Sequence, residues 1–345
     1  MMYKIDKKAL LARCLVSGRM LAPLARIRSA CRADVPILAY HRIWDIRCED
    51  AFPFDVELVS ASVAEFRWQM EYVRENFDPI TFAALLDILE GITPAPPRPI
   101  IITFDDGFED NFENAFPILS ALEIPATIFL STGYIASQQT FWYDRLAHML
   151  LLAPERELTA KGFAETIQLG PDAKSRRRAL RKVLAELKLM PNQCRLEVLG
   201  HLEFELGPLS EDRPSLESRP LNWDQVREMA QAGIEFGSHT VTHPILANLT
   251  DDELEFELAE SRRAIEMQTG KPVTTISYPV GGRNAFNDRV RQEVQRAGYR
   301  LGVSYIPGTN PLSGLDHYGL RRQHVERYTE RSYFAAMLGL PEVFR

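Results

Sequence analysis

Residues 99–107 read PIIITFDDG. The run Pro99–Phe104 is short, apolar and rich in β-branched residues, which predicts a buried strand. Asp105 and Asp106 follow directly, so the strand places two adjacent carboxylates in the loop at its carboxyl end. Adjacent carboxylates repel unless a cation or a proton lies between them. Asp-Asp-Gly is also an ordinary turn sequence, so this stretch alone leaves both interpretations open.

Further apolar runs and amphipathic patterns alternate along the chain. The other predicted strands are 36–40, 126–130, 234–237, 273–278 and 300–304, and the predicted helices are 62–77, 82–90, 114–122, 223–232, 250–269 and 288–297. Strands that alternate with helices indicate an α/β fold with a largely parallel sheet or barrel. In such folds, chemistry gathers at the carboxyl ends of the strands.

Two segments depart from this alternation. Residues 134–220 show helical patterns at 143–152, 174–189 and 193–204 but no convincing strand, and the polar segment 207–220 closes them. We interpret the region as a helical insertion in the barrel, with a lid as one interpretation of its role. Residues 1–32 hold eight Lys and Arg against one Asp. The alternatives are a basic helix packed on the domain and an interfacial helix held against anionic lipid.

The second polar cluster is SHTVTH at 238–243. It follows a predicted strand, so it lies at the same kind of end as the Asp pair. His239 and His243 are four residues apart and would share one face of a helix. This spacing suits two imidazoles that bind one metal ion, although a lone HxxxH is often a helix surface. One carboxylate, two imidazoles and water form an open catalytic site that supports metal-assisted hydrolysis.

Three motifs in this order, TFDDG at 103–107, SHTVTH at 238–243 and SYPVGG at 277–282, resemble the polysaccharide deacetylases of carbohydrate esterase family 4. VPILAYHRI at 35–43 resembles the branch that deacetylates biofilm poly-N-acetylglucosamine and exopolysaccharides. The resemblance covers roughly residues 35–133 and 221–325 and implies a distorted (β/α) barrel. We therefore expect a barrel domain over residues 35–345. The helical insertion at about 134–220 and a basic helical segment at 1–34 lie outside the matching motifs. It also implies metal-dependent removal of an N-acetyl group from an amino sugar in a polysaccharide, oligosaccharide or lipid-linked precursor.

By the same resemblance, Asp105 is the catalytic base, and Asp106, His239 and His243 are the metal ligands. The backbone N–H of Val280 is the expected donor to the oxyanion. One divalent ion is expected, with zinc first and iron, cobalt or nickel as alternatives.

The chain departs from the family pattern in two motifs. Ser277 stands where the family has an arginine that orients the base, and Arg321 or Arg322 is a candidate replacement from another strand end. The family's Leu-x-His near the carboxyl end is also absent. We therefore expect His41, at the end of the first strand, to be the general acid; the alternative is a buried histidine satisfied by hydrogen bonds.

Several aromatic and polar residues lie near the motifs and are candidates to line a sugar groove, with core packing as the alternative. They are Trp142, Tyr143, Asp144, Trp223, Tyr278 and Arg321.

Bulk properties limit the partners and the compartment. A net charge of −7 argues against a nucleic-acid partner. Four scattered cysteines in 345 residues favour a reducing compartment. Residues 1–32 lack the uninterrupted apolar core of a signal peptide. We therefore expect a cytoplasmic enzyme, with peripheral contact to the inner membrane face through residues 1–32 as the sharper alternative.

Two rival functions use the same residues. One is a deformylase or another hydrolase of non-peptide amides on this scaffold. The other is an inactive carbohydrate-binding relative, which the altered motifs would allow.

Overall fold

The computed structural model describes residues 7–159, 163–207 and 218–344. Its centre is a closed ring of seven parallel strands in the order β2-β14-β12-β11-β10-β7-β6, which the pairing of β6 with β2 closes. Their bounds are β2 Ile37–Tyr40, β6 Pro99–Phe104, β7 Thr127–Leu130, β10 Glu235–Ser238, β11 Thr275–Ser277, β12 Leu301–Pro307 and β14 Leu320–His324. The predicted α/β barrel is confirmed.

Short strands lie around the ring. β5 (Asp78–Pro79) extends the sheet beside β6, β1 (Asp34–Val35) pairs antiparallel with β13 (Asn310–Pro311), and β3 (Arg42–Ile43) pairs with β4 (Val59–Ala61). β14 was not predicted, because its sequence LRRQH lacks an apolar run.

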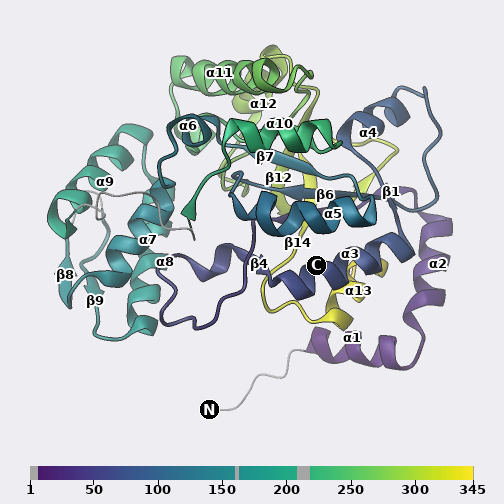
Figure 1. Cartoon of the computed structure of the whole chain (residues 1–345), viewed down its shortest axis with the longest axis horizontal. Helices are drawn as coiled ribbons and strands as arrows, with labels where there is room; N and C mark the ends of the chain where they lie inside the picture. The colour runs from purple at the N-terminus through teal and green to yellow at the C-terminus, as the bar shows by residue number, and fades with distance from the viewer. Residues whose placement is uncertain (1–6, 160–162, 208–217, 345) are drawn as a thin grey trace.

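Helices cover the outside of the ring (Figure 1). They are α3 Val63–Asn76, α4 Phe82–Leu89, α5 Phe116–Leu122, α10 Trp223–Gln231, α11 Asp251–Thr269, α12 Asp288–Arg296 and α13 Arg331–Gly339. The start of α11 has the predicted capping box, in which Thr250 and Glu253 satisfy each other's backbone N–H groups.

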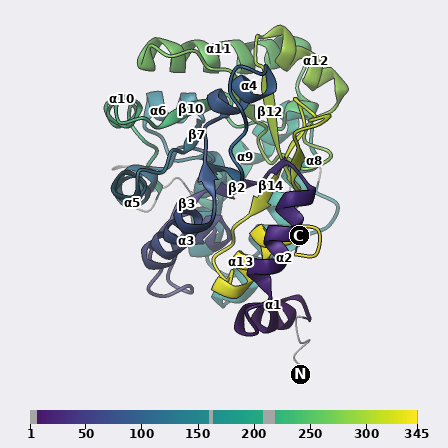
Figure 2. The same ribbon diagram turned by 90° about the vertical axis from the view of Figure 1, so that its right-hand side faces the viewer.

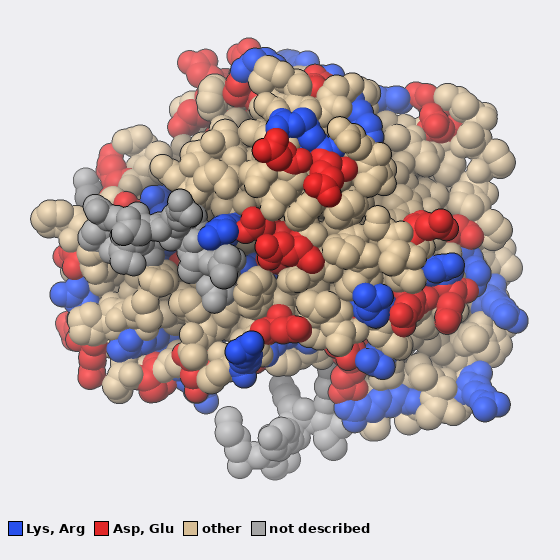
Figure 3. Space-filling model, viewed as in Figure 1, with Lys and Arg blue, Asp and Glu red and all other residues tan. Residues whose placement is uncertain are grey.

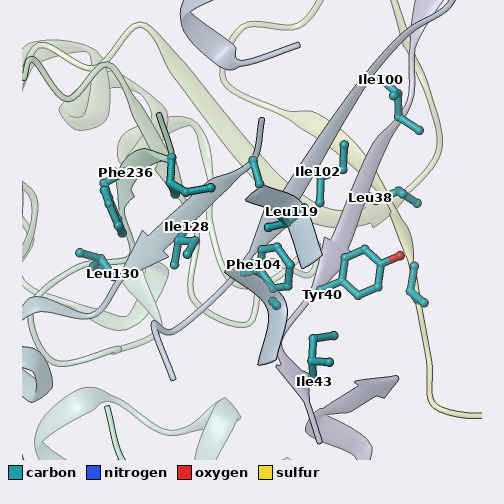
Figure 4. Close-up of a cluster of buried hydrophobic side chains, with 14 of the residues drawn as sticks. Leu38, Tyr40, Ile43, Ile100, Ile102, Phe104, Leu119, Ile128, Leu130 and Phe236 are labelled. Carbon is teal, nitrogen blue, oxygen red and sulfur yellow. The ribbon is translucent and has the colours of Figure 1, made fainter. Parts of the chain in front are cut away.

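The strands are buried on both faces, as parallel strands between helices and a barrel interior must be. Along β6, Ile100, Ile102 and Phe104 pack outward into the main core, whereas Ile101 joins a separate cluster with β2, β12 and α4. Figure 4 shows the outward set with Leu38 and Tyr40 of β2. The alternation follows from the two-residue period of a strand.

The insertion forms a body of its own beside the barrel, on the left in Figure 1. Its helices are α7 Trp142–Leu152, α8 Ala173–Leu189 and α9 Asn192–Leu206, which share a second hydrophobic core. The short helix α6 (Thr132–Ser137), which leads into it, packs on the barrel side near α11. An antiparallel pair, β8 (Arg156–Leu158) and β9 (Ile167–Leu169), corrects the expectation that the insertion has no strand. Each of these strands has only three residues, too few for a periodic pattern to register. Most of segment 207–220 lies outside the described residues.

The amino-terminal segment forms two helices, α1 (Lys7–Ser17) and α2 (Leu21–Cys31), rather than one. Gly18 and Arg19 separate them, and Arg19 has a φ of +55°. Both helices lie against α13 at the end of the molecule away from the insertion (Figures 1 and 2).

Candidate active site

A cavity of about 610 Å³ lies at the carboxyl ends of the barrel strands. The barrel contributes residues that follow β2, β6, β10 and β11, and the insertion contributes Trp142, Tyr143, Leu184 and Lys188. The predicted catalytic and metal-binding side chains all line it: His41, Asp105, Asp106, His239 and His243. Residues as far apart in sequence as His41 and His243 therefore meet in one pocket, as the parallel strand ends predict.

Asp106, His239 and His243 form a buried group whose potential ligand atoms lie within 4.8 Å of one another. Oδ1 of Asp106 is 3.4 Å from Nε2 of His239 and 3.3 Å from Nε2 of His243. Two ligands of a tetrahedral zinc ion, each about 2.0–2.1 Å from the metal, lie about 3.3 Å apart. Oδ1 of Asp106 is buried and has no hydrogen-bond partner among the described residues. The three side chains therefore fit a divalent metal ion.

The backbone around the ligands is held in an unusual conformation. Asp106, Thr240, His243 and Val280 all have positive φ, between +55° and +74°. Such conformations cost about 1–3 kcal/mol each for non-glycine residues and concentrate at functional sites. Gly107 has a φ of +82°, and a Cβ there would lie 2.7 Å from Leu130, so the turn after the Asp pair requires glycine.

The histidines do not lie on a helix, and this corrects the helical interpretation of HxxxH. Residues 239–243 form a loop after β10, because Thr240 and His243 leave the helical region of φ and ψ. Glu257 of α11 holds the loop by accepting hydrogen bonds from the N–H groups of Val241 and Thr242. The carbonyl of Ser277 bonds Nδ1 of His239 at 2.7 Å, which leaves Nε2 free to bind a metal.

Asp105 is bound by Arg322, which sequence reasoning named only as one of two candidates. The buried Arg322 donates from Nη1 to Oδ1 at 2.8 Å and from Nη2 to Oδ2 at 2.6 Å. Nη2 also donates to Oγ of Ser277, so the small residue at the family's arginine position receives the replacement guanidinium. Burial opposes ionisation of Asp105, but the charges of Arg322 and His239 and the hydrogen bonds from Arg322 together outweigh it and hold the pKa of Asp105 at about 2. Asp105 is therefore ionised at neutral pH.

His41 lies directly after β2, with Nε2 4.0 Å from Oδ2 of Asp105. Its backbone is fixed on both sides: its N–H donates to Oγ of Ser60, and its carbonyl accepts from Nδ2 of Asn111. Burial lowers the pKa of His41, although the charges of Asp106 and Asp105 oppose the shift. His41 therefore lies beside the predicted base and outside the group of three predicted metal ligands.

Val280 lies in the cavity wall, in the loop after β11. Its φ is +63°, and its N–H has no acceptor among the described residues. The next residue, Gly281, has a φ of +56°, and a Cβ there would lie 2.5 Å from the backbone N of Tyr305. The tight turn therefore keeps an unused backbone donor at the cavity.

Three of the six predicted substrate-binding residues line the cavity, and a fourth lies directly behind its wall. Trp142, Tyr143 and Tyr278 line the cavity, and Nε1 of Trp142 donates to the carbonyl of His243. Asp144 is buried behind the wall, where Oγ of Ser218 donates to it.

Two of these predictions are not supported by the geometry. Trp223 packs against the main core, away from the cavity. Arg321 is exposed and outside the cavity, because side chains alternate along β14 and Arg322 takes the inward position.

Sequence reasoning missed several residues of the wall. Tyr305 of β12 contacts the ring of His41, and its ring stacks on His324. Asp55, Glu57 and the segment Val325–Tyr328 form the mouth with Lys188 of the insertion. Of these residues, only Val325–Tyr328 directly follow a strand, and that strand was itself unpredicted.

Comparisons with known proteins identify the family. The family model described as polysaccharide deacetylase matches residues 93–302. The chain belongs to the polysaccharide deacetylase family. It is therefore a hydrolytic deacetylase that removes N-acetyl groups from a glycan.

The deacetylase is similar to the Bacillus subtilis protein YxkH, named as a polysaccharide deacetylase, with 24% identity over 91% of this chain and 79% of that protein. It is 29% identical to the poly-beta-1,6-N-acetyl-D-glucosamine N-deacetylase of Escherichia coli K12 over 90 residues, which are 26% of this chain and 12% of that protein.

Solved structures share the fold. The Streptococcus pyogenes deacetylase PplD, in complex with acetate, superposes with a TM-score of 0.59 and 19% identity, over 91% of this chain and 99% of that one. A de-N-acetylase from Aggregatibacter actinomycetemcomitans superposes with a TM-score of 0.58 and 16% identity, over 87% of this chain and 98% of that one.

Proposed function

We propose that this deacetylase hydrolyses the N-acetyl group of an amino sugar in a polysaccharide, oligosaccharide or lipid-linked glycan precursor, with one divalent metal ion held by Asp106, His239 and His243. The ligand spacing near 3.3 Å supports the proposal. Zinc fits the compact set of one carboxylate and two imidazoles; iron, cobalt and nickel accept the same ligands. A divalent ion held there would polarise the acyl carbonyl and acidify water.

The remaining roles fall to residues of the chain. Asp105 accepts a proton from the water whose oxygen attacks the acyl carbon, and Arg322 keeps that carboxylate ionised and oriented. The Val280 N–H donates to the oxygen that becomes negative. His41 donates a proton to the amine nitrogen as the C–N bond breaks, which releases acetate and the free amino sugar.

The mouth of the cavity supports a sugar substrate. Trp142, Tyr143 and Tyr305 give the inner wall aromatic surfaces, which pack against the apolar faces of pyranose rings. Tyr328, 70% exposed, lies at the rim with charged side chains that can bond sugar hydroxyls.

We also propose a cytoplasmic location at the inner membrane face, with residues 1–34 as an appendage of the catalytic domain 35–345. The four cysteines support a reducing compartment, since all are exposed and unpaired. The basic composition of residues 1–32 supports peripheral membrane contact.

Acetate release from N-acetylglucosamine oligomers and a lipid-linked analogue tests the proposal. Wild type, Asp105→Asn and His239→Ala would be compared after loading with zinc, with bound metal measured in each. His201→Ala is the matched control, because His201 is an exposed residue of α9 outside the cavity.

We expect acetate from wild type and His201→Ala alone, and loss of metal only in His239→Ala. If the enzyme releases formate from N-formylated sugars but no acetate from N-acetylated ones, the proposed substrate carries an N-formyl group instead of an N-acetyl group. Metal binding without any acyl release would contradict the proposed substrate class.

A further inference from the structure

The helices α1 and α2 are docked rigidly on the catalytic domain. Ala12 and Leu21 are buried in the main core beside α13. Arg28 forms ion pairs with Asp34 and Glu342, and Arg13 pairs with Glu330. The outward surface of this helix pair therefore keeps a fixed orientation relative to the barrel.

That surface is unusually apolar. Of the fifteen large apolar side chains that are exposed among the described residues, six lie between residues 10 and 27. Met20 caps the start of α2, and Leu24 and Ile27 follow it within the helix at i+4 and i+7, so the three side chains form one stripe. Ile27 is 64% exposed and Met20 is 55% exposed. Leu10 and Leu11 add to the patch from α1.

The same end of the molecule is strongly basic. Residues 1–32 carry a net charge of +7, which leaves −14 on the rest of the chain. Figure 3 shows Lys and Arg gathered over α1 and α2, at lower right. A groove of about 590 Å³ lies between α2 and the barrel, and its walls include Arg19, Arg26 and Arg98. None of these three arginines has an ion-pair partner within the described ranges.

The basic, apolar surface and the active site lie at opposite ends of the barrel. Pro99, the first residue of β6, lines the groove, whereas Asp105, just past the end of that strand, lines the catalytic cavity. Pro36 and His41 flank β2 in the same way. Six residues of strand rise about 20 Å. A flat surface that contacts α1 and α2 would therefore leave the cavity on the far side.

We propose that α1 and α2 form an interfacial surface that binds an anionic phospholipid bilayer and directs the catalytic mouth away from it. The stripe Met20, Leu24 and Ile27 enters the boundary between headgroups and acyl chains. Arg19, Arg26 and Arg98 contact lipid phosphates, and the acidic remainder of the chain is repelled from the bilayer. No helix among the described residues is long and apolar enough to cross the membrane. The orientation rests on the proposed function and selects among its substrates. A polysaccharide or oligosaccharide reaches the mouth from the side away from the lipid, whereas a short glycan linked to a lipid of the same bilayer does not.

Vesicle sedimentation tests the surface. Wild type should bind vesicles that contain phosphatidylglycerol and not vesicles of phosphatidylcholine alone. Leu24→Glu/Ile27→Glu should weaken binding at least tenfold, and Arg19→Gln and Arg26→Gln should each weaken it about fivefold. Phe256→Glu/Met267→Glu is the matched control, because it places the same charges at exposed apolar positions of α11 and should bind like wild type.

An assay with soluble substrate distinguishes failure of the membrane-binding proposal from failure of the proposed catalytic function. All these variants should release acetate from soluble oligomers at the wild-type rate, so loss of binding with intact turnover supports the surface. Equal binding of the stripe variant and wild type would overturn it. A wild-type dimer that the stripe variant converts to monomers, with no vesicle binding, would show that a second copy covers the stripe instead.

The native cysteines test the orientation. Cys31 continues the stripe of α2, and Cys194 lies on α9 of the insertion; both are exposed. Variants that keep one of these cysteines would carry a fluorophore, and the vesicles would carry a lipid quencher. Strong quenching at Cys31 with little at Cys194 is expected. The reverse pattern would show that the mouth faces the bilayer.

Discussion

Replacing Arg322 with leucine should destabilise the protein strongly, and replacing Asp105 with asparagine in the same chain should restore much of the loss. Both side chains are buried, and they share two hydrogen bonds of 2.8 and 2.6 Å. Removing one partner of a buried ion pair costs about 3–5 kcal/mol, because the other charge stays in a dry site. The replacement also removes the hydrogen bonds that Arg322 donates to Ser277 and Ser304.

The double variant has no uncompensated charge at this position. Its loss should therefore be smaller than the sum of the two single losses, by about 3 kcal/mol. Urea unfolding of the metal-free wild type, both single variants and the double variant measures this coupling.

A second cycle on Arg331 and Glu65 provides the control. This pair also has two hydrogen bonds, from Nε and Nη2 of Arg331 at 3.0 and 2.9 Å, but it is exposed to solvent. Its coupling should be close to zero, since solvent screens exposed pairs. Additive losses for Arg322 and Asp105 would refute the argument that burial makes this pair interdependent, and with it the view that Arg322 replaces the missing motif arginine.

Three other changes have expected outcomes. Burial raises the pKa of Asp144 to about 7 from an ordinary value of 3.8. The folded state therefore binds the proton of Asp144 more tightly than the unfolded state does. Wild type thus loses stability as pH rises from about 4 to 7. Asp144→Asn should then be more stable than wild type at pH 8, by at most about 4 kcal/mol, with no gain at pH 4; a pH-independent difference in urea unfolding would contradict this. His41→Ala should lower kcat by about 10²–10⁴ with metal content unchanged, and near wild-type turnover would remove His41 from the mechanism. Gly107→Ala should cost about 1–3 kcal/mol in calorimetry because its Cβ meets Leu130 at a positive φ, and unchanged stability would show that this turn relaxes.

The sequence by itself determined the barrel and placed the candidate ligand set at its strand ends. Apolar runs such as Pro99–Phe104 are buried on both faces, so their pattern is strong and local. Asp105, Asp106, His239 and His243 follow such runs directly, and parallel strands bring their carboxyl ends together at one edge. Local signals and one topological rule were therefore enough to place these residues in a common pocket.

Only the tertiary structure decided which arginine binds Asp105. Arg321 and Arg322 are neighbours with identical side chains, and β14 lacks the apolar pattern that would reveal which of them faces inward. The answer depends on the pairing of β14 with β2 and β12, a contact between segments far apart in sequence.

The sequence also did not reveal that His239 and His243 lie in a loop. A spacing of four residues fits a helix, but Glu257 on α11 binds the backbone of the intervening residues and fixes a loop. The sequence determined which chemical groups are present and on which strand ends. Long-range packing determined their orientation, because hydrogen bonds between distant segments leave no periodic trace in either segment.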